Sequence, residues 1–266
     1  MQMPVAYIPH GGGPWPFMER PMGRKEDWVP LRAYLESLPA LLPEKPKAIL
    51  VISAHWEEHV PTLMTSPRPP MLYDYGGFPP ETYQIRWDAP GAPDLARQVA
   101  GLLAAAGLPT ADSPTRGFDH GTFVPLKVAW PDADVPTLQL SLVRGLDPAL
   151  HLAIGRALAP LREEGVFIVG SGMSYHNMRG FGSPASLAVS KTFDDWMGAA
   201  VALEPAARDA ALTAWDRAPE ARACHPREEH LLPLMVAAGA AGASRGEVAF
   251  RSTIMGTLVS AIHFSG

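Results

Sequence analysis

Cysteine is nearly absent from this sequence of 266 residues, which contains only Cys224. A single thiol excludes an internal disulfide and any metal site built from several cysteines. Long hydrophobic runs are missing as well, because no uninterrupted apolar stretch approaches the roughly 20 residues that a membrane-spanning helix requires. Residues 1–13 also lack the basic-then-apolar order of a secretory leader. We therefore expect a cytoplasmic protein that has no membrane partner.

An excess of charge of one sign is missing too. The chain has 22 basic and 27 acidic residues, a net charge of −5, and no cluster of lysine or arginine. Because nucleic acids and anionic surfaces are bound by such clusters, neither is an expected partner. Proline and glycine, with 29 and 24 residues, stay below the bias of disordered chains. They indicate many rigid loops on a compact body.

Apolar, β-branched runs alternate with segments of helical periodicity along the chain. Strands are predicted over 5–9, 48–54, 137–142 and 166–170. Helices are predicted over 27–42, 94–106, 148–164, 186–203, 206–218 and 227–240. This alternation, without a linker or an internal repeat, predicts one α/β domain over residues 1–266. In it, helices flank a central, mostly parallel mixed sheet.

Turn-forming residues mark the ends of several of these elements. Gly107 and Gly165 follow predicted helices as C-terminal stops, and Asp94 has the position of an N-cap. The tail over 247–264 has the pattern of two strands around a Met-Gly turn, which predicts an antiparallel hairpin at the sheet edge. A segment rich in proline, glycine and aromatic residues covers 67–93, and a loop of that length is usually functional.

Three histidines follow apolar runs that stop at a small or turn-forming residue. His10 closes VAYIPH, His55 closes AILVISAH, and His176 comes just after VFIVGSGMSYH. In open α/β sheets the ligand binds beyond the carboxyl ends of the strands, so imidazoles from three strands would converge there. Neutral imidazole is the commonest protein ligand for a redox-capable or Lewis-acid metal. We therefore predict a metal centre at this edge of the sheet.

Two further histidines have two interpretations each. His120, in RGFDHGTF, is either a turn residue or a functional group whose ring the neighbouring Asp119 orients. His230, in HPREEHLLP, is predicted in the first turn of a helix beside Glu229, where the helix dipole favours acidic residues anyway. The remaining four are interpreted as ordinary surface or core histidines: His59, His151, His225 and His263.

Seven motifs occur in order along the chain: HGGGP, SAHW, YDYGGFP, GFDHG, PxxQLS, GSGxxxHN and EHLLP. Together they resemble the class III extradiol ring-cleaving dioxygenases, in particular the branch similar to DOPA 4,5-dioxygenase. The resemblance covers about residues 4–233, and seven motifs at matching spacing are specific although each alone is weak. It implies an α/β fold with a mononuclear non-haem metal, in agreement with the metal centre predicted from the strand ends.

The resemblance implies that His10, His55 and His230 bind one metal ion. The implied metal is Fe(II), with Zn(II) an alternative in purified or crystallised protein. His176 is implied to lie next to the metal as an acid or base, or as an additional ligand. His120 is implied to be a second acid or base that faces the substrate. The implied reaction opens the aromatic ring of a catechol-type substrate with O2.

The chain departs from the family pattern at the first motif. The family often has SHGSP where this chain has PHGGG over residues 9–13, and the lost hydroxyl affects substrate or hydrogen bonding rather than metal binding. A second point stays open, because relatives in the wider class use a carboxylate as the third ligand. Glu229 is therefore an alternative to His230 and would complete a 2-His-1-carboxylate triad. The sequence also leaves open a homo-oligomer.

Aromatic and basic residues supply candidates for substrate contacts. Five aromatic side chains are candidates for an apolar pocket wall, with a place in the core as the alternative: Trp56, Tyr73, Tyr75, Phe78 and Phe123. Arg86 and Arg179 are candidates for pairing with a substrate carboxylate, with an ordinary surface cation as the alternative.

Two other classes of function are open to this sequence. HGGG also resembles the oxyanion loop of lipase-like serine hydrolases, but the required GxSxG elbow has its nearest counterpart in 172–176, which ends in His176. The second is a non-catalytic metal-binding or signalling protein on the dioxygenase fold, because fold does not fix function. Five candidate histidines argue against it, since a scaffold does not need them.

Overall fold

A computed structural model describes residues 2–265 and contains one eight-stranded mixed sheet in the order β4-β3-β5-β2-β6-β1-β8-β7. The strands are β1 (Val5–Pro9), β2 (Ala48–Glu58), β3 (Thr62–Met64), β4 (Ala111–Ser113), β5 (Thr137–Val143), β6 (Val166–Gly172), β7 (Gly246–Ile254) and β8 (Thr257–Phe264). The four central strands, β5, β2, β6 and β1, are parallel to one another. The β7–β8 hairpin pairs antiparallel with β1 and closes one edge.

The burial of each strand follows from its place in the sheet. Every residue of β1, β5 and β6 is buried, as expected for parallel strands covered on both faces. Exposed and half-buried residues alternate along the edge strand β7 instead. The sheet therefore has a fully buried centre, and the carboxyl ends of the central strands meet at one edge.

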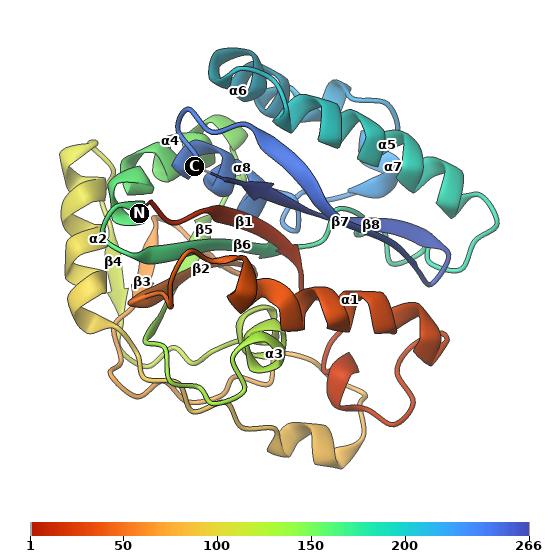
Figure 1. The fold of residues 1–266 in the computed structure, drawn as a ribbon, viewed down its shortest axis with the longest axis horizontal. Helices are drawn as coiled ribbons and strands as arrows, with labels where there is room; N and C mark the ends of the chain where they lie inside the picture. Colours follow the sequence, from red (N-terminus) through yellow and green to blue (C-terminus); the bar gives the residue numbers. More distant parts are fainter. Residues whose placement is uncertain (1, 266) are drawn as a thin grey trace.

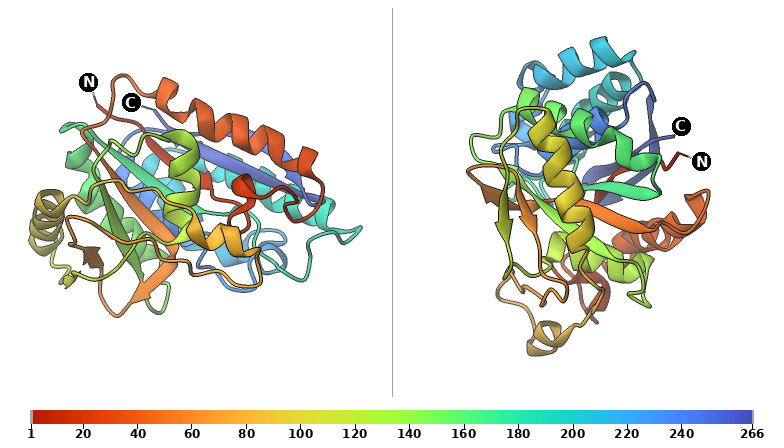
Figure 2. Two further views of the ribbon diagram at one scale, coloured as in Figure 1. Left: turned by 90° about the horizontal axis from the view of Figure 1, so that it is seen from below. Right: turned by 90° about the vertical axis from the view of Figure 1, so that its left-hand side faces the viewer.

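Helices cover both faces of the sheet. They are α1 (Lys25–Ser37), α2 (Pro93–Ala105), α3 (His120–Ala129), α4 (Pro148–Leu158), α5 (Ser186–Val201), α6 (Pro205–Thr213), α7 (Ala221–Cys224) and α8 (Leu232–Ala240). Figure 1 shows α1 and α3 on one face, and α4, α5, α6 and α8 on the other. Figure 2 shows α2, in yellow, which packs against β3 and α4. Within the described residues, no helix combines the length and the apolar character needed to cross a membrane.

The predicted fold class is confirmed. The predicted strand over 5–9 coincides with β1, the other three strands are each somewhat longer than predicted, and the C-terminal hairpin forms at the sheet edge. Gly107 and Gly165 both adopt the positive φ expected of a residue that ends a helix. The short strands β3 and β4 were not predicted, because three residues carry too little periodicity.

The helices begin within two residues of their predicted starts, with one exception. The helix predicted over 227–240 begins at Leu232. Pro233 explains this, because it has no N–H to donate to the Glu229 carbonyl and is tolerated only in a first turn. The prediction of Asp94 as an N-cap is also wrong. Ala92 is the N-cap and Pro93 opens the helix, so Asp94 lies in the first turn.

The predicted helices also end early in several places. Those over 27–42 and 148–164 each finish as a short 3₁₀ turn, and the one over 206–218 breaks after Thr213 into another. A tightened last turn satisfies carbonyl groups that the α-helix leaves free.

Candidate metal centre

His10 and His55 reach the site from two strands of the parallel centre. His10 follows the last residue of β1, and its backbone N–H donates to the Gly172 carbonyl at 3.1 Å. His55 lies inside β2, in the stretch between Ile52 and Glu57 where pairing with β5 loses its regular register. The predicted strand stopped just before His55; the irregular pairing releases its ring from the regular side-chain alternation.

His230 belongs to the turn that precedes α8, and that turn is fixed to the sheet. Its carbonyl accepts the Tyr7 hydroxyl at 2.7 Å and the Met173 N–H at 3.1 Å. Gly172 makes the approach possible, because a Cβ at that position would lie 2.1 Å from the His230 carbonyl oxygen. The glycine at the end of β6 thus brings a residue 58 positions later onto the strand ends.

The imidazoles of His10, His55 and His230 converge on one point. The Nε2 atom of His55 lies 3.1 Å from Nε2 of His10 and 3.3 Å from Nε2 of His230. Nitrogen ligands about 2.1 Å from a cation, at tetrahedral or octahedral angles, lie about 3.0–3.4 Å apart. The spacing of the three nitrogens therefore fits a single cation, and this group can hold a metal ion.

The outer ring nitrogens of two of these histidines have acceptors that set the tautomer. Nδ1 of His10 lies 3.0 Å from the Ser171 hydroxyl, which itself donates to the Gly121 carbonyl and therefore accepts from the ring. Nδ1 of His230 donates to Oε1 of Glu229 at 2.9 Å. With the proton on Nδ1, each Nε2 presents its lone pair inward, as a metal ligand must.

Burial keeps all three rings neutral. Burial and the neighbouring imidazoles lower the pKa of His10 and of His230 well below the ordinary value. Burial and the His120 ring lower the pKa of His55 to about 3. Neutral imidazole is the form that binds metal, so the site is prepared for a cation at neutral pH.

Glu229 lies on the outer side of His230. Its Oε1 accepts from Nδ1 of His230 and, at 3.1 Å, from Nδ1 of His176, while Oε2 is 3.3 Å from Arg227. Burial raises the pKa of Glu229, but the hydrogen bond from His176 and the charge of Arg227 outweigh it, so the pKa is lowered. The carboxylate can thus accept hydrogen bonds from two imidazoles, while His230 joins the group that contains His10 and His55.

His176 and His120 flank the three converging rings. His176 stacks on His230, with ring centroids 3.3 Å apart, and His120 packs against His55 at 3.9 Å. Nδ1 of His120 donates to Oδ1 of Asp74 at 2.8 Å, and Oδ2 of Asp74 lies 3.7 Å from Nδ1 of His55. The fold thus brings together all five candidate histidines: His10, His55, His120, His176 and His230.

Asp119 does not orient His120, contrary to the sequence-based interpretation. Its carboxylate caps α3 by accepting the Thr122 N–H, and it pairs with Arg116 at 2.9 Å in the buried interior. Asp74 makes the contact instead. Sequence reasoning missed Asp74 and Ser171, although both lie within quoted motifs, YDYGGFP and GSGxxxHN.

The predicted aromatic wall is present in part. Tyr75 meets His120 edge-on at 5.8 Å and contacts Phe78, and Tyr73 packs against Phe123 at 6.0 Å. Trp56 is buried instead beneath a guanidinium group. The four histidines interpreted as ordinary have partners outside the cluster, as the bonds of His59, His151, His225 and His263 show.

Neither candidate arginine contacts the histidine cluster. Arg86 is exposed and pairs with Asp88 at 2.5 Å. Arg179 is also exposed, and its backbone N–H donates to the Asn177 side chain. Both therefore match the alternative interpretation, an ordinary surface cation.

The model of the family described as "catalytic LigB subunit of aromatic ring-opening dioxygenase" matches residues 4–261. The chain belongs to this family. It is 41% identical over 227 residues to a 4,5-DOPA dioxygenase extradiol of Beta vulgaris, with 84% of each chain covered. It is 35% identical to the Escherichia coli K12 protein of the same name, covering 90% of this chain and 85% of that one.

A solved structure agrees with these sequence relatives. The crystal structure of an uncharacterized protein from Escherichia coli K12 superposes with a TM-score of 0.80 and 28% identity, covering 99% of this chain and 100% of the other. The predicted class of enzyme, an extradiol ring-cleaving dioxygenase, is thereby confirmed. The serine hydrolase and the non-catalytic scaffold are set aside.

Proposed function

We propose that the protein opens the ring of a catechol-type substrate with O2, at one metal ion held by His10, His55 and His230. The observation that carries this proposal is the convergence of three neutral Nε2 atoms within 4.8 Å of one another. Two of these rings keep their protons on outer nitrogens that face Ser171 and Glu229. Relatives named 4,5-DOPA dioxygenase extradiol support a substituted catechol as the substrate class.

The native metal in this proposal is Fe(II), with Zn(II) as the ion acquired on purification. Imidazole ligands suit both ions. A bound Fe(II) supplies the one-electron chemistry that O2 requires to react with a closed-shell diol, which Zn(II) cannot supply. In extradiol opening the ring C–C bond beside the diol breaks, and both oxygen atoms of O2 enter the product.

His120 and His176 are proposed to move the protons. In each ring Nδ1 donates to a carboxylate, from Asp74 for His120 and from Glu229 for His176. This leaves Nε2 as the free nitrogen, which can accept a proton from a substrate hydroxyl and return it to the product. Since the two rings stand beside His55 and His230, the substrate is held between two proton carriers.

The aromatic side chains around His120 are proposed to orient the substrate ring and keep water away. Tyr75, which meets His120 edge-on, is half-buried, and the Tyr75 hydroxyl donates to the Thr82 carbonyl at 2.6 Å. Burial raises the pKa of this phenol, so Tyr75 stays neutral.

We also propose a cytoplasmic location, because the cysteine of the chain, Cys224, is a buried free thiol.

Oxygen uptake tests this function directly. Anaerobically iron-loaded protein is mixed with O2 and a panel of catechols, and the product is identified by its visible absorbance. We expect stoichiometric O2 consumption and a ring-opened semialdehyde from at least one catechol, and neither from the His55→Ala variant. Iron-loaded protein that opens no catechol would overturn the proposal.

A further inference from the structure

A cavity of about 220 Å³ lies beside His176. Its wall is formed largely by methionine and aromatic side chains: Met22, Met173, Met178, Met255, Trp28 and Phe181. A dry apolar cavity of roughly 150 Å³ already binds benzene, so this one has room for a ring or a short alkyl chain.

The cavity borders the proposed metal centre. Gly11, which follows His10, belongs to its wall, and its N–H points to the sulfur of Met173 at 3.3 Å. His176 belongs to the wall as well and stacks on His230. A group attached to a ring bound at the centre can therefore extend into this cavity.

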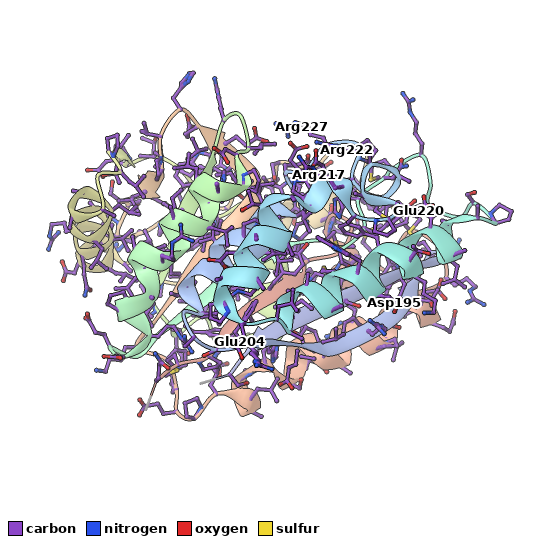
Figure 3. All side chains as sticks on the ribbon, turned by 90° about the horizontal axis from the view of Figure 1, so that it is seen from above. Asp195, Glu204, Arg217, Glu220, Arg222 and Arg227 are labelled. Carbon is purple, nitrogen blue, oxygen red and sulfur yellow. The ribbon has the colours of Figure 1, made fainter. Side chains whose placement is uncertain are left out.

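The cavity offers no charge to a charged substituent. Among the described residues that line it, His176 is the single titratable group. The arginines nearest the centre are already paired: Arg116 with Asp119, and Arg227 with both carboxylate oxygens of Glu57 at 2.6 Å (Figure 3 labels Arg227). A carboxylate buried in this wall would lack the bidentate cation that normally balances it.

We propose that this cavity receives an uncharged, apolar substituent of the catechol ring, so that the substrate is an alkyl- or aryl-substituted catechol rather than a catechol amino acid. The inference rests on the proposed function and names the substrate class of the same site. Methionine is unbranched and polarizable, so four of them form a wall that adapts to substituents of different shape. Selectivity then comes from apolar burial at the substituent, while the diol is bound at the centre.

The test compares matched substrates on iron-loaded protein. 4-Butylcatechol and 3-(3,4-dihydroxyphenyl)propionate have side chains of similar length, and only the second is charged. We expect kcat/KM for 4-butylcatechol to exceed that for the propionate and for L-DOPA by at least about 10-fold, mainly through KM. This follows because each methylene removed from water adds to the free energy of binding, whereas a buried carboxylate without a partner subtracts from it. Anaerobic calorimetry of binding provides a readout that does not depend on turnover.

Variants of the wall locate the effect. Met22→Glu and Met178→Glu each add a charge, at a half-buried and an exposed position of the wall. Both are expected to raise KM and Kd for 4-butylcatechol about 10-fold, a larger change than for unsubstituted catechol. Leu203→Glu, at an exposed site beyond α5, is the matched control and should change neither.

Three outcomes would overturn the inference. A preference for L-DOPA or the propionate is one, especially if Arg179→Ala then raises KM for the charged substrate. Equal kcat/KM for catechol and 4-butylcatechol is another; in both cases the ring-opening function itself stands. If iron-loaded protein opens none of these catechols, the proposed function fails and the inference fails with it.

Discussion

At the scale of single residues, each imidazole of the centre is distinguished by the partner of its outer nitrogen. Nδ1 of His10 faces a hydroxyl that has already donated its own proton, and Nδ1 of His230 faces a carboxylate. These contacts fix which nitrogen is free. Residues whose free nitrogen joins the converging group of His10, His55 and His230 can bind a metal, and the flanking His120 and His176 can carry protons. Mutations can therefore be sorted by two measurements, metal content and turnover.

The first prediction concerns the third metal ligand. We expect His230→Gln to lose most bound iron and Glu229→Gln to keep it, because Nε2 of His230 lies 3.3 Å from Nε2 of His55 while Glu229 contacts the outer nitrogen. Removing such an outer partner typically lowers metal affinity about 10–100-fold, so Glu229→Gln should still bind iron when the metal is supplied in excess. Metal analysis of both variants after anaerobic loading measures this, with circular dichroism as the control for folding. Iron lost from Glu229→Gln but kept in His230→Gln would assign the ligand to the carboxylate.

The second prediction concerns the two proton carriers. Replacing His120 or His176 with Ala is expected to lower turnover by about 10²–10⁴-fold, the usual contribution of a general acid or base. Iron should stay bound in both variants, which distinguishes them from His10→Ala. Single-turnover rates together with metal content give the measurement. Loss of iron from His176→Ala would show that His176 is a ligand. Near-normal turnover of His120→Ala would show that His120 has no role in proton transfer.

At the scale of elements, the residues at strand ends were predictable and those in turns were not. His10 and His176 follow continuous apolar runs, so their positions beyond the sheet follow from the alternation of strands and helices. His230 follows no strand, and it reaches the site because Gly172 admits its backbone. Sequence pattern contains no signal for that approach, and only the resemblance to a known family singled out His230.

Contacts between residues far apart in the chain could not be predicted from the sequence either. Asp74 comes from the long segment that joins β3 to α2, and nothing in its local pattern specifies that it meets His120, 46 positions later. The same holds for Ser171, which looks like an ordinary small residue of a strand until the ring of His10 is placed against it.

The third prediction concerns the packing of α1 against β8. The Tyr34 hydroxyl of α1 contacts Nε2 of His263 in β8 at 2.7 Å. Burial lowers the pKa of His263 from its ordinary value of 6.5 to about 4, so the folded state holds this ring neutral. Because the unfolded chain binds the proton first as pH falls, this group's stabilisation is present above pH 6.5 and is lost towards pH 4.

The size of the effect follows from the two pKa values. Between pH 7 and pH 5, protonation of His263 in the unfolded chain removes about 2 kcal/mol of stability. His263→Gln keeps an acceptor for Tyr34 but does not titrate, so its stability should fall less over the same interval. Urea unfolding of both proteins at the two pH values measures the difference. Equal acid sensitivity of the two proteins would contradict the assignment.

At the scale of the whole molecule, the proposed metal joins distant parts of the chain. His10 follows β1, His55 lies in β2 and His230 lies in the turn before α8, so an ion bound to all three stabilises only the folded state. The fourth prediction is that metal at about 100 times its Kd adds about 2.7 kcal/mol of stability. For a chain of this size that corresponds to a rise in Tm of about 5 °C.

Calorimetry with and without metal tests this linkage. Chelation should lower Tm by the same amount, and His55→Ala should show a Tm that does not respond to metal. A Tm of the unaltered protein that stays constant over a wide range of Fe(II) or Zn(II) concentration would contradict a site shared by three elements.

The central position of β1 has a consequence for how the chain is made. β1 pairs only with β6 and β8 among the described strands, and these begin at Val166 and Thr257. During synthesis β1 therefore has no strand to pair with until more than half of the chain has been made. Such long-range pairing is intrinsically slow and leaves an apolar strand exposed to aggregation. The site of His10, His55 and His230 forms later still, because a nascent chain cannot bring the three rings together until His230 has been added.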